Sequence, residues 1–101
     1  MSNDPEFFNR YSESLNLFNK QMQDSGLPGH NIAASAAYAA ARYAIWATAN
    51  TTISPGDLET RRQHAIDTFT QGYRDMLEEH FNDFVANYNS YYQHKPGAIT
   101  R

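Results

Sequence analysis

The chain has 101 residues, a length that suits one domain with one modest core. With 41% hydrophobic and 14% aromatic residues it does not have the composition of a disordered protein. Its net charge of −3 and its lack of any basic run argue against nucleic acid or an anionic membrane as a partner. It has no cysteine, which excludes disulfides and thiolate chemistry. The N-terminus has no secretory signal pattern, so we expect a cytoplasmic protein.

A first helix is predicted over residues 5–24. Asp4 is a good N-cap, and Pro5 suits the first helical position because its missing N–H would be unpaired there anyway. Apolar residues recur at steps of three and four and form one stripe: Phe7, Phe8, Tyr11, Leu15, Phe18 and Met22. The Gly- and Pro-containing segment 25–29 then predicts a turn.

A second helix is predicted over residues 32–50, with Asn31 as its cap. Ten of the seventeen residues 33–49 are Ala, the strongest helix former. One side of this helix carries alanine alone: Ala33, Ala36, Ala37, Ala40, Ala44 and Ala47. We expect this smooth side to allow close helix packing, so that the substitution Ala40→Leu would overpack it. A membrane span is not expected, because the segment contains Arg42 and other polar residues.

Arg42 is the only formally charged residue between Asp24 and Asp57. Tyr38 and Trp46 lie one helical turn to either side of it, so its guanidinium can stack on both rings. In a structural interpretation, the arginine passes the rings and pairs with an acid of the third helix. In a functional interpretation, Tyr38, Arg42 and Trp46 form a small site for an anion or a partner.

A third helix is predicted from Pro55 to about Tyr92. Ser54 can cap it, and Asp57 lies three residues further on, close to a capping box. Its apolar stripe first follows Leu58, Ala65, Ile66, Phe69, Tyr73, Met76 and Leu77, and then drifts onto Phe81, Phe84, Val85, Tyr88 and Tyr92. Unbroken, this helix would be about 55 Å long against about 30 Å for each of the others. We therefore expect either a break near residues 80–83 or packing of its far half on another chain.

These patterns predict an all-α fold: a three-helix bundle whose long third helix is bent or broken. We expect a single helical domain over residues 1–101, with an ordered core at about residues 5–92 and a flexible tail at 93–101.

Asp75, Glu79 and Asp83 are spaced at i, i+4 and i+8 and could present three carboxylates to a divalent cation. Carboxylate metal sites in helix bundles usually draw Glu-x-x-His pairs from several helices, and this pattern is absent here. A solvated acidic face is the favoured interpretation, and we expect no tightly bound metal and no cofactor.

Three stretches of the chain resemble a family of small bacterial proteins that share a domain of unknown function, family 3144. They are EFF at residues 6–8 with Arg10, SAAYAAARY at residues 35–43, and YRDMLEEH at residues 73–80 with Asp83. The resemblance extends over most of residues 6–92. It implies a bacterial and cytoplasmic origin and supplies no catalytic residues.

The expected function is therefore non-enzymatic: a protein–protein interaction protein or accessory subunit that self-associates. Its partner would be itself or another protein, and neither nucleic acid nor a membrane. The alternative is a small-ligand or metal-binding module that uses Arg42 or the Asp75/Glu79/Asp83 cluster. The candidate interaction or ligand surface comprises Tyr38, Arg42, Trp46, Phe81, Phe84, Tyr88 and Tyr92.

Overall fold

A computed structural model describes residues 4–92 and contains five helices and no strand within that range. The predicted all-α class is confirmed. Contacts divide the chain into two compact units, Met1–Thr51 (unit 1) and Thr52–Arg101 (unit 2), which are described separately. The three-helix bundle and the single domain stay predictions, and the predicted flexible tail lies outside the described residues.

Helix α1, Pro5–Ser25, begins and ends as the sequence predicts. The amide of Glu6 donates to the Asp4 carboxylate at 2.9 Å, which satisfies one of the unpaired donors of the first turn. At the other end Gly26 has φ +72°, a left-handed conformation, and its amide donates to the carbonyl of Met22 at 2.9 Å. This glycine ends the helix and directs the chain into the turn.

The substitution Gly26→Ala is expected to lower the stability of the chain by about 1 kcal/mol, because an L side chain disfavours positive φ. Thermal unfolding followed by circular dichroism measures the effect. No atom lies within 4 Å of a Cβ built at this position, so a loss of stability reports backbone strain and not a clash. An unchanged melting temperature would contradict this prediction.

Helix α2, Gly29–Ala49, begins three residues earlier than predicted, and Asn31 lies inside it. Pro28 takes the N-cap position with an extended backbone and no side-chain cap. Its carbonyl accepts the amides of Asn31 at 3.0 Å and Ile32 at 3.3 Å. The first turn therefore closes on the proline carbonyl, which the capping rule for Asn did not anticipate.

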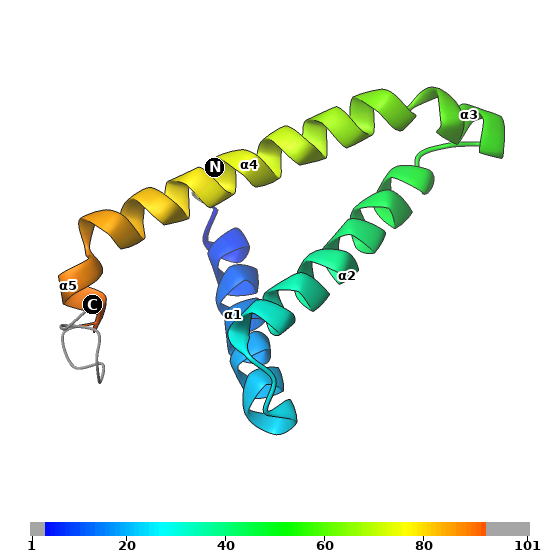
Figure 1. The fold of residues 1–101 in the computed structure, drawn as a ribbon. Coiled ribbons are helices and arrows are strands. Elements are labelled where there is room, and N and C mark those ends of the chain that lie inside the picture. Colours follow the sequence, from blue (N-terminus) through cyan, green and yellow to red (C-terminus); the bar gives the residue numbers. More distant parts are fainter. Residues whose placement is uncertain (1–3, 93–101) are drawn as a thin grey trace. The chain divides into compact units, whose positions relative to one another are not determined.

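Within unit 1, α1 and α2 meet beside the turn and diverge from it (Figure 1). Ile32, 8% exposed, is the only buried residue among residues 4–92. Phe18, Ala36 and Ala37 are half-buried, whereas Ala40 is exposed. The prediction that Ala40 lies in a close helix contact is therefore not supported within unit 1, because the helices separate before they reach it.

Unit 2 comprises α3, Pro55–Thr60, α4, Arg62–Ala86, and α5, Tyr88–Tyr92. The predicted N-cap is confirmed, since the amide of Asp57 donates to Ser54 Oγ at 3.0 Å. The third predicted helix is broken at Arg61 and again at Asn87, where α5 turns away from the axis of α4 (Figure 1). Of the two alternatives expected for this helix, the break near residues 80–83 is not found, because α4 continues through that segment to Ala86.

Within α1 and α4, ion pairs join residues three or four positions apart on the exposed surface, as in Arg10–Glu6 at 2.6 Å and Lys20–Asp24 at 2.8 Å. Between α3 and α4, the side chain of Arg62 donates a hydrogen bond to the Glu59 carboxylate, and this bond holds the pKa of Glu59 below the usual range. The pairs within one helix stabilise that helix and do not fix tertiary structure. None of the helices in residues 4–92 has the length and hydropathy of a membrane-spanning segment.

Candidate functional site

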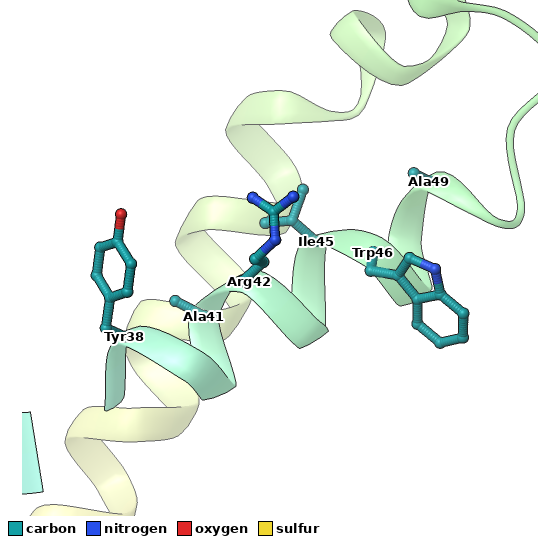
Figure 2. A pocket seen from close by; sticks show the side chains of 6 residues that line it. All are labelled: Tyr38, Ala41, Arg42, Ile45, Trp46 and Ala49. Atoms are coloured by element: carbon teal, nitrogen blue, oxygen red, sulfur yellow. The ribbon is translucent and has the colours of Figure 1, made fainter. Parts of the chain in front are cut away.

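A shallow groove follows one face of α2, and six side chains line it: Tyr38, Ala41, Arg42, Ile45, Trp46 and Ala49 (Figure 2). We call this the Arg42 face. On the helical wheel it lies opposite the half-buried Ala37, Ala44 and Thr48, which are rotated from Arg42 by roughly 120–160° at 100° per residue. Unit 1 therefore leaves the Arg42 face uncovered.

The aromatic rings of the Arg42 face are not arranged as the sequence suggested. The indole of Trp46 packs against Tyr43, with ring centroids 5.2 Å apart and an angle of 33° between the planes. Figure 2 shows this indole directed away from the guanidinium of Arg42. Tyr38, 82% exposed, extends into solvent. The predicted stacking of Arg42 between the two rings is therefore wrong, because Tyr43 three residues before Trp46 supplies its ring contact.

Arg42 also differs from the other basic residues in residues 4–92. Arg10, Lys20, Arg61, Arg62 and Arg74 each form an ion pair with a carboxylate three or four residues away. Helix α2 has no acidic residue, and Arg42 forms no ion pair within residues 4–51. The face thus presents one uncompensated positive charge among apolar side chains.

The second candidate region is the corner between α4 and α5. Phe84 contacts Tyr91 with ring centroids 4.9 Å apart and Tyr92 at 6.4 Å, and Tyr88 contacts Tyr92 at 5.0 Å. We call these four residues the aromatic corner. The end of the third predicted helix thus folds back on α4, but Phe81 and Val85 on α4 remain 72% and 66% exposed. Phe84, Tyr88 and Tyr92 are brought together, and Phe81 lies outside their cluster.

Asp83 fixes the aromatic corner through hydrogen bonds. Its carboxylate accepts from Asn87 Nδ2 at 2.8 Å and from the Tyr91 hydroxyl at 2.8 Å, and its carbonyl accepts the Asn87 amide at 2.9 Å. From the sequence, Asp83 was expected on a solvated acidic face, and this role was not predicted. The spacing of Asp83, Asn87 and Tyr91 at i, i+4 and i+8 was a usable signal, because these residues face one another across successive turns.

The substitution Asp83→Ala is expected to destabilise the corner by about 1 kcal/mol, because it removes two side-chain hydrogen bonds that are partly exposed to water. Amide hydrogen exchange should become faster in α5 and unchanged in α1 and α2. As a matched control, Asp75→Ala removes one exposed hydrogen bond, to Gln71, outside the corner and should leave α5 exchange unchanged. Equal protection of α5 in Asp83→Ala and in the wild type would contradict the role of Asp83.

The acidic residues of α4 do not form a metal site. No group of three or more His, Asp or Glu side chains within residues 4–92 is placed to hold a metal ion. Asp75 accepts a hydrogen bond from Gln71 at 2.8 Å, and Asp83 is engaged in the corner. Of the three carboxylates considered as alternative ligands, Glu79 alone has no partner among these residues.

Residues 7–85 match the family described as "Protein of unknown function (DUF3144)". The fold is similar to that of the NMR structure of a protein from Shewanella sp., with 25% sequence identity and a TM-score of 0.73. That similarity covers 90% of this chain and 95% of the Shewanella protein. No curated protein matches the chain.

Proposed function

Since the chain belongs to the DUF3144 family, whose description assigns no activity, we propose its function from its own surfaces: it is a non-enzymatic interaction protein that associates with a second copy of itself. The predicted family membership is confirmed. In this proposal the protein acts in the bacterial cytoplasm as an accessory subunit. Neither catalytic residues nor a cofactor take part.

The uncovered apolar stripe of α4 supports this proposal most strongly. Within unit 2 only α5 contacts it, at Phe84, and its large apolar side chains are exposed: Ile66, Phe69, Tyr73, Met76, Leu77, Phe81, Phe84 and Val85. These residues extend over about 30 Å of helix at 1.5 Å per residue. Contiguous apolar surface of this extent is typical of protein interfaces, which are rich in aromatic residues and Met.

A second copy is the simplest partner that covers the stripe. A two-fold axis buries the same surface on both chains without any further sequence feature, and such dimers are the commonest oligomers. The Arg42 face suits a helical partner better than a small ligand. One helix alone lines its groove, so a bound small molecule would remain open to water on its other side, whereas ligand sites bury most of the ligand.

Light scattering at micromolar concentration tests the proposal. We expect twice the monomer mass, with a dissociation that becomes visible on dilution. A strict monomer whose Trp46 fluorescence is that of a buried indole would overturn the proposal, because the chain would then bury its apolar surface without a second copy.

A further inference from the structure

Two charged side chains take no part in the ion pairs and side-chain hydrogen bonds of residues 4–92. Among residues 4–92, Arg42 is the only Lys or Arg without an ion pair. Glu79 is the only carboxylate in the same range that accepts neither a hydrogen bond nor an ion pair. Both side chains are exposed. The described chain therefore leaves one cation and one anion without a partner.

The surroundings of Arg42 favour a partner that is apolar with one negative charge. The groove beside it is lined by Tyr38, Ile45 and Trp46, and no acid on α2 neutralises the guanidinium (Figure 2). A charge that is desolvated by apolar contact without a counter-charge is costly. A partner that covers this face and supplies a carboxylate would offset that cost.

The surroundings of Glu79 match that requirement. On the helical wheel of α4, Glu79 lies between Asp75 and Asp83, within roughly 20° of Gly72 and 60° of Met76, which marks the edge of the apolar stripe. A Cβ built at Gly72 meets nothing within 4 Å, so this part of α4 has space for an approaching helix. Glu79 thus lies where the acidic residues of α4 border its apolar stripe, beside the small residue Gly72.

The net charges of the helices decide which element of a second copy fits against α4. Helix α4 has two arginines against five carboxylates, a net charge of −3, whereas α2 has a single charge, the positive Arg42. Two α4 helices packed on each other would bring like charges together, which disfavours association. Helix α2 brings the opposite charge and an apolar groove.

We propose that the Arg42 face of α2 in one copy packs on α4 of a second copy, with Arg42 of the first paired to Glu79 of the second. A two-fold axis makes this pair twice. This inference rests on the proposed self-association and names the surfaces that form it.

Charge reversal tests the pair. Each of the single variants Arg42→Glu and Glu79→Arg places like charges opposite each other twice per dimer, and should raise the dissociation constant about tenfold or more. The double variant Arg42→Glu/Glu79→Arg restores opposite charges and should associate nearly as well as the wild type. An equimolar mixture of the two single variants should also associate, because each copy then meets its complement. Analytical ultracentrifugation gives the dissociation constants.

Charged residues that already form an ion pair in the chain provide the controls. Arg62→Glu and Glu78→Arg make the same charge changes, and each should alter the dissociation constant less than about threefold. If the wild type is a dimer but the Arg42→Glu and Glu79→Arg variants bind as tightly, this inference is overturned and the proposed function stands. Restoration by the double variant without restoration by the mixture would also overturn it, because the pair would then lie within one chain. A monomeric wild type overturns both proposals.

Discussion

Phe81→Asp is expected to convert the proposed dimer into a monomer at micromolar concentration. Phe81 is 72% exposed in the chain and lies on the apolar stripe that the proposed dimer buries. An interfacial aromatic residue commonly contributes about 2 kcal/mol or more, and here the loss would occur twice. We therefore expect the dissociation constant to rise at least about a hundredfold, measured by light scattering on dilution.

Phe81 is a better probe than Phe84 because it lies outside the aromatic corner. Phe84→Asp would disrupt the contacts with Tyr91 and Tyr92. A weaker dimer could then result from a folding defect and not from the loss of an interface contact. Val85→Asp, also on the exposed stripe, is a second variant that should behave as Phe81→Asp does. Asn82→Asp adds the same charge at the adjacent position and should change the dissociation constant less than about threefold.

Circular dichroism should show equal helix content in Phe81→Asp, Val85→Asp and Asn82→Asp. A wild-type dimer that survives Phe81→Asp and Val85→Asp unchanged would show that the exposed stripe is not the association surface.

Ile32→Ala is expected to cost about 2 kcal/mol of folding stability. Ile32 is the one buried residue of the described chain and lies where α2 leaves the turn beside α1. Truncation of a buried isoleucine to alanine costs about 2–5 kcal/mol, and the higher helix propensity of alanine offsets a few tenths of this loss. The melting temperature should fall by about 10 °C for a chain of this size.

Ile53→Ala is the matched control for this substitution, because it deletes the same atoms from a side chain that is almost fully exposed. Its melting temperature should stay within about 2 °C of the wild type. Equal melting temperatures for Ile32→Ala and Ile53→Ala would mean that the contact at the turn does not hold α1 and α2 together.

Local signals predicted the helices and their ends well. The cap at Asp4, the stop at Gly26 and the start at Ser54 each depend on residues within four positions, and the structure has all three. The start of α2 was predicted three residues late, because the Pro28 carbonyl closes the first turn without any side-chain cap. Family membership was also predictable, since three stretches of sequence carry the resemblance.

The candidate site was predicted only in part. That Arg42 is a lone charge follows from composition, because no acid lies within reach on α2. Its predicted stacking on Trp46 was wrong, because a side chain has several rotamers and Tyr43 competes for the same ring. For the same reason the acidic residues of α4 could be counted from sequence, but their partners could not be assigned.

The sequence by itself determined the all-α class, the helix ends and the excess of apolar surface, because these depend on short-range propensity, capping and periodicity. Only the tertiary structure decided which parts of that apolar surface are buried. It placed the break of the third helix at Asn87, since hydrogen bonds to Asp83 hold the corner there, and it left Ala40 exposed because α1 and α2 diverge. Burial depends on contacts between residues far apart in the chain, and Ile32, the one buried residue among residues 4–92, lies at the start of α2, the helix that contacts α1.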